Sequence, residues 1–357
     1  MVDQLDLSRL TRQYAGRGSK AHHPATLLSI LIYGYCTGVF SSRKLERATY
    51  DSVAFRYLAA GTHPDHDTLA TFRRRFLGEF SELFIQVLEL AREMKLLKLG
   101  NVCLDGTKVH ANASRHSALS HGHIEKLETQ LQAEVQELLA LAEKTDQADV
   151  PDGIDLPAEI RRREDRLATM AEAKAKIAAR AEERYQREKA EYNAKLTKRA
   201  EKEKSTGKKP GGKPPAAPMS GPKDSDQINL TDEESRIMPV SGGGFEQAYN
   251  AQAAVDTETM LVVATGLTQA PNDKEQVKPM LETLAAQTRR LGKVTGLIAD
   301  TGFCSETNIK ACETAGIAPL IAVAKADHHP DWRERHSEPP ALPENAATLQ
   351  AMAHRLK

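Results

Sequence analysis

The sequence predicts a mixed α/β protein: a helical N-terminal domain, followed by a mixed sheet that a long helical hairpin interrupts. Three observations favour this fold class. Apolar residues recur at helical spacing through residues 1–98, β-prone runs alternate with helical patterns from residue 249 onward, and residues 117–204 are rich in Ala, Glu, Lys and Arg. A chain of 357 residues is long enough for two to three domains and a sizeable core.

Charge is high but balanced, with 49 basic and 49 acidic residues, so the net charge gives no overall signature of nucleic-acid binding. The acidic start excludes a signal peptide, and the most apolar run, residues 27–36, is about half as long as a membrane span. The cysteines show no Cys-x-x-Cys spacing. We therefore expect a cytoplasmic protein with four buried free thiols: Cys36, Cys103, Cys304 and Cys312.

Residues 1–98 are predicted to form the helical domain. Pro24 is expected in the first turn of a helix, where proline is favoured. The apolar positions of that helix follow helical spacing: Leu27, Leu28, Leu31, Ile32 and Tyr35. The N-cap of the last short helix is expected at Asp65 or Asp67. Three short helices are predicted in all, near residues 41–49, 51–58 and 67–80.

The last of these helices is basic. It carries Arg73, Arg74 and Arg75 between two phenylalanines, Phe72 and Phe76, whose rings are expected to face a core. A helix, a tight turn and an arginine-rich helix indicate a helix-turn-helix-like unit, in which arginines contact phosphates or base edges. The alternative is a solvated face on an ordinary helical bundle.

The sheet domain is expected to comprise residues 99–116 and 227–325. Its patterns run strand, insertion, strand, strand, helix, strand, helix, strand, which predicts a mixed sheet flanked by helices. The expected strands are 102–105 with a continuation at 109–111, 249–255, 261–267, 294–299 and 317–323, and the expected helices are 274–291 and 305–315.

The insertion, residues 117–204, is predicted to be an antiparallel helical hairpin or coiled coil, with helices at 117–144 and 157–203. It would clamp DNA or mediate self-association, or it is only a charged surface arm. Residues 205–226, rich in Gly, Pro and Lys, are expected to form a flexible basic linker. Residues 326–357 are expected to form a proline-rich loop and the start of a helix.

Two aspartates, Asp105 and Asp300, each follow an apolar, β-prone run and are expected at the ends of the first and fourth strands. Carboxylates brought side by side repel each other, and a divalent cation removes that repulsion. Mg²⁺ prefers such oxygen ligands, so the pair predicts phosphodiester chemistry on a metal centre. For either aspartate alone, capping of the following turn is the better explanation, whereas the two together, in matching contexts, favour the metal site. A zinc site is not expected, because the histidines have no usual ligand spacing: His110, His116, His121, His123, His328 and His329.

The sequence resembles the DDE-type transposases of bacterial insertion sequences, which have a ribonuclease H-like catalytic domain. The resemblance covers nearly the whole chain. The segments that carry it are His23-Pro24 with residues 42–46, residues 64–68 with 72–76, residues 104–108 with 111–114, residues 232–238 leading through 242–244 to 249–256, and residues 300–303.

By that resemblance Asp105 and Asp300 are the first two acids of the catalytic triad and ligands of Mg²⁺ or Mn²⁺. The implied partners are double-stranded DNA, as element terminal repeats and target, and further copies of the chain on that DNA. No membrane partner is expected, and a DNA-bound chain would be associated with the nucleoid. The residues expected to contact DNA are Arg43, Lys44, Arg73, Arg74, Arg75 and Lys108.

The family's third acid is a glutamate in a Tyr-x-x-Arg-x-x-x-Glu-x-x-x-x-x-x-Lys pattern, and nothing in this sequence matches that pattern. Glu344 is the candidate substitute for this third acid. Glu313 is not a candidate, because it lies before the last strand, whereas the family's glutamate lies beyond it. The sequence therefore predicts a C-terminally truncated transposase that binds DNA with little or no Mg²⁺-dependent cleavage. The alternatives are a fragment that only binds DNA or oligomerises, and a ribonuclease H-like nuclease.

Overall fold

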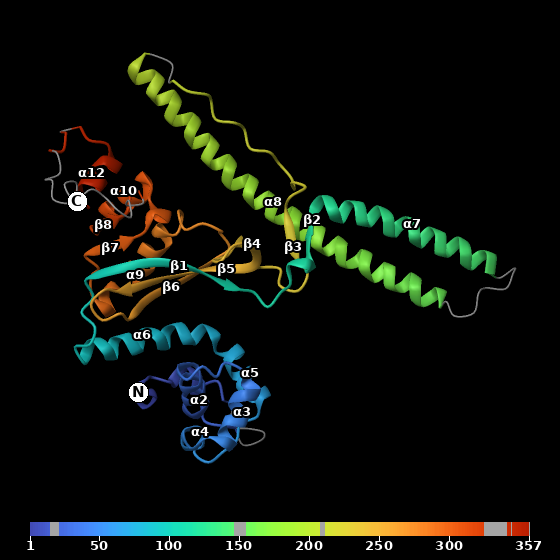
Figure 1. Ribbon diagram of the computed structural model, residues 1–357, viewed down its shortest axis with the longest axis horizontal. Helices are drawn as coiled ribbons and strands as arrows, with labels where there is room; N and C mark the ends of the chain where they lie inside the picture. Colours follow the sequence, from blue (N-terminus) through green and yellow to red (C-terminus); the bar gives the residue numbers. More distant parts are fainter. Residues whose placement is uncertain (15–20, 146–154, 208–210, 325–340, 344, 357) are drawn as a thin grey trace. The chain divides into compact units, whose positions relative to one another are not determined.

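The computed structural model describes the chain except residues 15–20, 146–154, 208–210, 325–340, 344 and 357 (Figure 1). Helices and a mixed sheet are both present, which confirms the predicted mixed α/β class. The chain divides into two units, the first comprising residues 1–105, 253–265 and 274–357, and the second residues 106–252 and 266–273. Within the described residues, no helix is both long and apolar enough to cross a bilayer.

The N-terminal part of the first unit is helical, as the sequence predicted. A 3-10 turn at Val2–Gln4 precedes α1 (Ser8–Thr11), α2 (Pro24–Cys36), α3 (Ser42–Asp51), α4 (Val53–Leu58), α5 (His66–Arg75) and α6 (Leu77–Glu93). Pro24 begins α2, where its missing N–H is not needed. Asp65 caps α5, because its side chain accepts a hydrogen bond from the Thr68 backbone N–H at 2.6 Å.

The predicted helix 67–80 is wrong at its C-terminal end, because α5 and α6 are separate helices. Phe76, the residue between them, leaves helical geometry with φ −106° and ψ 21° and is fully buried. Its ring stacks on that of Tyr14 and lies 5.0 Å, centroid to centroid, from the ring of Phe72. Packing in the helical core therefore fixes the break.

The sheet has the strand order β4-β5-β1-β7-β8, with β6 paired to β5. Its strands are β1 (Asn101–His110), β4 (Arg236–Pro239), β5 (Phe245–Asp256), β6 (Val262–Thr268), β7 (Gly296–Ala299) and β8 (Ala318–Ile321). β7 is parallel to both β1 and β8, whereas β4 is antiparallel to β5. The edge strand β4 was not predicted, since four residues ending in proline carry little strand periodicity.

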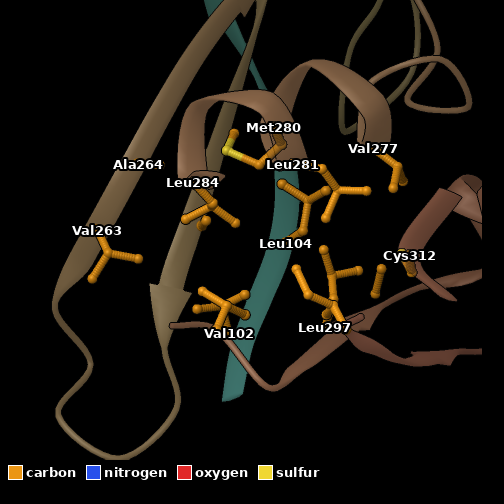
Figure 2. Close-up of a cluster of buried hydrophobic side chains, with 14 of the residues drawn as sticks. Val102, Leu104, Val263, Ala264, Val277, Met280, Leu281, Leu284, Leu297 and Cys312 are labelled. Carbon is orange, nitrogen blue, oxygen red and sulfur yellow. The ribbon is translucent and has the colours of Figure 1, made fainter. Parts of the chain in front are cut away.

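Helix α9 (Val277–Leu291) packs on the sheet residues of the first unit (Figure 2). The side chains that meet there are buried and apolar: Met280, Leu281 and Leu284 from α9, Val102 and Leu104 from β1, and Leu297 from β7. The first unit also contains a 3-10 turn at Thr301–Phe303, α10 (Glu306–Thr314) and α12 (Thr348–Arg355). One face of β1 and β7 thus packs against this core.

Two ion pairs join α6 to α9 within the first unit. Arg290 of α9 places Nε 2.6 Å from Glu89 Oε1 and Nη1 2.8 Å from Glu82 Oε1. The hydrogen bond from Arg290 lowers the pKa of Glu89. Each of the three side chains is about a third exposed, so solvent screening limits each pair to about 1 kcal/mol.

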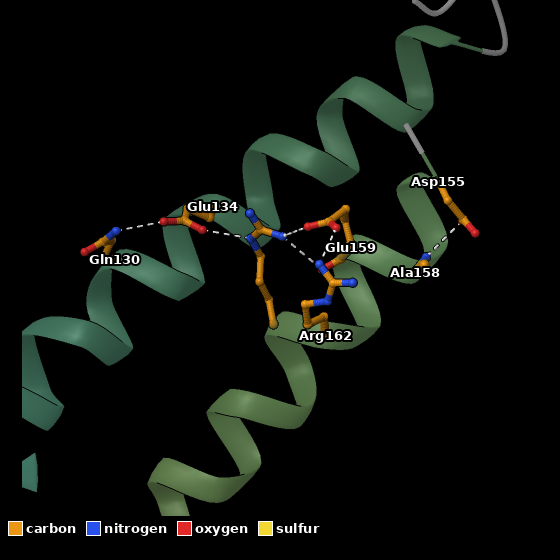
Figure 3. Close-up of polar contacts among 7 residues, drawn as sticks. Gln130, Glu134, Asp155, Ala158, Glu159 and Arg162 are labelled. Atoms are coloured by element: carbon orange, nitrogen blue, oxygen red, sulfur yellow. Dashed lines mark hydrogen bonds and ion pairs between the residues drawn. The ribbon is translucent and has the colours of Figure 1, made fainter. Parts of the chain in front are cut away.

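The second unit contains the predicted helical hairpin, formed by α7 (His121–Thr145) and α8 (Leu156–Thr206). The buried side chains between the helices are Ile124, Leu131, Met170, Ala173 and Ile177. Arg163 Nε of α8 also lies 2.8 Å from Glu134 Oε2 of α7, and Asp155 caps α8 by accepting from the Ala158 N–H (Figure 3). A small apolar core and polar contacts along it hold the hairpin together.

The first helix of the hairpin begins later than predicted, because residues Ala118–Ser120 form a strand, β2, that pairs antiparallel with β3 (Gln227–Asn229). Ile228 of β3 is 2% exposed and packs into the hairpin core. Neither strand was predicted, since three residues are too few to show periodicity. This two-stranded ribbon joins the two ends of the insertion.

The segment 211–226, predicted as part of a flexible basic linker, has neither helix nor strand. It lies beside α8, because Arg199 donates a hydrogen bond to the Gly212 carbonyl at 3.2 Å and Arg184 donates to the Gly221 carbonyl at 3.1 Å. α8 extends to Thr206, and Gly207 ends it with a φ of 64°. The flexibility of the segment stays a prediction.

Candidate metal centre

Asp105, within β1, and Asp300, directly after β7, each follow the last residue that pairs these two parallel strands. β1 and β7 pair in the register Leu104↔Ala299, and each aspartate is the next residue along its chain. Neighbouring strands lie about 4.8 Å apart, so this register brings the two backbones side by side. Both aspartates are exposed.

Strand alternation places both carboxylates on the face opposite the core. Leu104 and Ala299 are buried with α9, and side chains alternate between faces along a strand. The Cys103 thiol, two residues before Asp105, lies on the same face. Burial raises the pKa of Cys103, and the charges of Asp105 and Asp300 raise it further. Both carboxylates therefore lie close enough to Cys103 to act on the same thiol.

The expectation that β1 ends at Asp105 is wrong. The strand runs without a break through Gly106 to His110. Pairing with β7 stops at Leu104, whereas the chain after Asp105 stays hydrogen-bonded on the β5 side, with the Ala111 N–H donating to the Gln247 carbonyl at 2.8 Å. Asp105 thus lies directly after the last residue of β1 that pairs with β7.

Asp300 also has the capping role that the sequence left open. It is the N-cap of the 3-10 turn Thr301–Phe303, and its Oδ1 accepts a hydrogen bond from the Gly302 N–H at 2.8 Å. A carboxylate has two oxygens and about four lone-pair sites, so one such bond leaves capacity for a cation. The cap orients the Asp300 side chain.

A polar cluster lies around Gly106 in the second unit. Asp273 Oδ1 accepts hydrogen bonds from Asn250 Nδ2 and Gln252 Nε2, each at 2.7 Å, and lies 4.0 Å from Lys108 Nζ. The Gln252 amide also donates to Asn250 Oδ1 at 3.0 Å. Asn250 and Gln252 are almost fully buried, so their hydrogen bonds are needed to offset burial of the amides.

This polar cluster (Lys108, Asn250, Gln252 and Asp273) was not predicted. Its sequence signal was present, because two amides stand at alternate, core-facing positions of β5, between Ala248 and Ala254. Asp273 gives no such signal, since it belongs to an irregular segment after β6. The Asn250 and Gln252 amides meet the Asp273 carboxylate only when the chain is folded.

The residues expected to contact DNA differ in their availability. Arg43 and Lys44 on α3, and Arg74 on α5, are exposed. Arg73 donates a hydrogen bond to the Tyr35 hydroxyl at 2.8 Å, and Arg75 donates to the Gln13 carbonyl at 2.7 Å. The Lys108 side chain is 17% exposed and lies in the polar cluster. Arg73, Arg75 and Lys108 therefore have contacts within the protein.

The cysteine thiols differ in their burial. The expectation of buried thiols is wrong for Cys36, which is exposed at the end of α2, and only Cys312 is fully buried. In the described part of the chain, no three His, Cys, Asp or Glu side chains form a cluster suited to a metal. Three residues considered in the sequence analysis lie outside the described residues: His328, His329 and Glu344.

Two family models match the chain. A transposase domain (DUF772) matches residues 1–75, and a transposase DDE domain matches residues 221–351. Together they cover more than half of the sequence. The chain belongs to the DDE transposases of insertion sequences. No curated protein matches the sequence.

The two matched ranges correspond to different parts of the structure. The first match ends at Arg75, the last residue of α5, and the second includes β7, Asp300 and the first half of α12. Asp105 and the helical hairpin lie between the two matches. DDE transposases bind DNA and generally use a divalent metal.

Proposed function

We propose that this transposase cuts and joins DNA at a centre in which Asp105 and Asp300 hold a divalent cation. The observation that carries the proposal is the Leu104↔Ala299 register, which aligns the two aspartates on parallel strands. Their exposure on the face opposite the core supports it, because the site must admit a DNA strand. The predicted chemistry is hydrolysis and strand transfer at phosphodiester bonds.

The two residues fit Mg²⁺ or Mn²⁺. Both supply carboxylate oxygens, the ligands that these hard cations prefer, and β1 and β7 hold them about one strand spacing apart. A bound divalent cation would activate the attacking water or 3′-hydroxyl and stabilise the leaving oxygen.

The protein's own contribution is rigid placement. Asp105 lies within β1 and Asp300 directly follows β7, two strands whose core-facing residues are buried. The Gly302 N–H also orients the Asp300 carboxylate. Sites built on strands are held more precisely than sites on loops. Asp105 and Asp300 thus bind the cation with little loss of conformational freedom.

A second candidate function is DNA binding with little cleavage. Within the described residues, no third His, Cys, Asp or Glu joins the two aspartates in a metal cluster. Two carboxylates hold one cation, and a paired-metal mechanism needs a further ligand for the second. The test is a duplex carrying the DNA that flanks the gene, incubated with the chain and Mg²⁺ or Mn²⁺. A retarded but uncut duplex supports this second candidate, whereas strand cleavage that Asp105→Ala abolishes supports a complete centre.

DNA binding by the N-terminal helices is tested by single alanine substitutions of Arg43, Lys44 and Arg74. Each is exposed, so we expect several-fold weaker binding of the flanking duplex without loss of stability. Removing one cation that neutralises a phosphate should also reduce the log–log salt slope by about 0.9. The control is Lys278→Ala, an exposed lysine on α9. Affinities equal to that of the control would assign the three residues to a solvated surface.

A further inference from the structure

A pocket of about 630 Å³ lies in the second unit where α8 passes β3 and β4. Arginines dominate its polar lining. Arg180, Arg184 and Arg187 follow one another at i, i+4 and i+7 on one face of α8, and Arg236 reaches the pocket from β4. We propose that this arginine pocket binds a phosphate of the DNA backbone, a role that rests on the proposed DNA transposition.

Two of these guanidinium groups have buried donors with no partner. Arg180 Nη2 donates to the Glu233 carbonyl at 2.8 Å, but Arg180 Nη1 is buried and makes no hydrogen bond within the described structure. Arg184 donates to Asp226 Oδ1 at 2.7 Å and to the Gly221 carbonyl at 3.1 Å, while its Nε is buried and unpaired within the described residues. Buried N–H groups of native proteins are almost always paired, so these two donors indicate an acceptor that binds in the pocket.

The positive charge is also incompletely balanced. Asp226 pairs with Arg184, whereas Arg180, Arg187 and Arg236 form no ion pair with a described carboxylate. The pocket also contains Glu183 and Glu234, so its formal charge remains positive by one. Burial and the charge of Arg180 both lower the pKa of Arg236. An anion between Arg180 and Arg236 would relieve this repulsion.

Phosphodiester is the anion that these groups fit best. Guanidinium is planar and offers parallel N–H donors, which match phosphate oxygens. The chain as a whole has a formal net charge of zero, with 49 basic and 49 acidic residues, so local basic clusters must supply its attraction to DNA. The pocket lies within the size range of ligand sites and is larger than one free phosphate needs. A DNA strand passing over α8 would place one phosphate in the pocket.

The test compares two doubly substituted chains with equal reduction of charge on the same helix. Arg180→Gln with Arg187→Gln removes two pocket arginines, and Arg161→Gln with Arg166→Gln removes two exposed arginines outside the pocket. The probe is the gene-flanking duplex, titrated at several salt concentrations. We expect the pocket variant to bind about tenfold more weakly than the control variant, with a log–log salt slope smaller by about 0.9 for each phosphate that is no longer neutralised. Equal affinities and slopes in the two variants would overturn the proposal.

A second measurement does not depend on variants folding. Phenylglyoxal modifies accessible arginines, and mass spectrometry locates the products. DNA is expected to protect Arg180 and Arg187 in the unsubstituted chain, whereas millimolar inorganic phosphate alone is expected to protect them weakly. Equal protection by phosphate and none by DNA would overturn the proposal in favour of a small-anion site. DNA binding that protects arginines elsewhere would overturn the pocket and leave the proposed transposase function intact, whereas failure to bind DNA at all would overturn both.

Discussion

Asp105→Asn and Asp300→Asn are each expected to remove most of the stabilisation that Mg²⁺ gives the chain. A ligand that binds only the folded state, at about 100 times its Kd, raises the free energy of unfolding by about 2.7 kcal/mol. Asparagine keeps the size of aspartate but loses the charge that attracts the cation. Without Mg²⁺ the variants should be as stable as the unsubstituted chain or slightly more so, because one of two neighbouring carboxylates is gone. Melting temperatures with and without Mg²⁺ measure both effects.

The matched control for that experiment is Asp165→Asn, an exposed aspartate of α8. It changes the net charge equally and should leave the Mg²⁺ response unchanged. The double variant Asp105→Asn with Asp300→Asn should lose no more of the Mg²⁺ stabilisation than either single variant, because the same single cation is lost in all three. A full Mg²⁺ response in Asp105→Asn would contradict a shared site.

Gly106→Ala is expected to lower the free energy of unfolding by about 1–3 kcal/mol, the usual cost of overpacking. A Cβ at this position would lie 2.4 Å from Gln252 Nε2 and 2.5 Å from Asp273 Oδ1. These atoms belong to the buried polar cluster, so moving them apart would also break the 2.7 Å hydrogen bond between them. Urea denaturation measures the destabilisation.

The control for this substitution is Gly78→Ala in α6, where no atom lies within 4 Å of the added Cβ. Alanine is favoured over glycine in a helix by about 0.5–1 kcal/mol, so Gly78→Ala should be neutral or stabilising. If Gly106→Ala and Gly78→Ala change the free energy of unfolding by the same amount, Gln252 and Asp273 do not pack tightly against Gly106.

The sequence predicted the elements that have enough residues to show a period. The helical spacing of Leu27, Leu28 and Leu31 predicted α2, and the alternation through residues 249–255 predicted β5. Strands β2, β3 and β4 have three or four residues each and were not predicted, whereas the equally short β7 and β8 were predicted within the longer runs 294–299 and 317–323. The break at Phe76 was missed for another reason, because a buried ring overrides a continuous helical pattern.

The candidate site residues stay a prediction. Asp105 and Asp300 were proposed because each follows an apolar run, and the parallel register of β1 and β7 brings the preceding residues, Leu104 and Ala299, side by side. Asp273 and Arg236 were not predicted as site residues, because both lie in or beside short irregular segments. Their contacts are with residues distant in sequence. Pairings of this kind depend on tertiary packing, which a local pattern does not contain.

The pairing of Asp105 and Asp300 around one cation is tested most directly by replacing that cation with Fe²⁺. With ascorbate and peroxide, bound Fe²⁺ generates hydroxyl radicals that cut the polypeptide close to the ion, and mass spectrometry locates the cuts. We expect cuts near both residue 105 and residue 300 in the same sample, suppressed by excess Mg²⁺ and absent from Asp300→Asn. Cuts near only one of the two aspartates, or only elsewhere in the chain, would show that they do not share a metal ion.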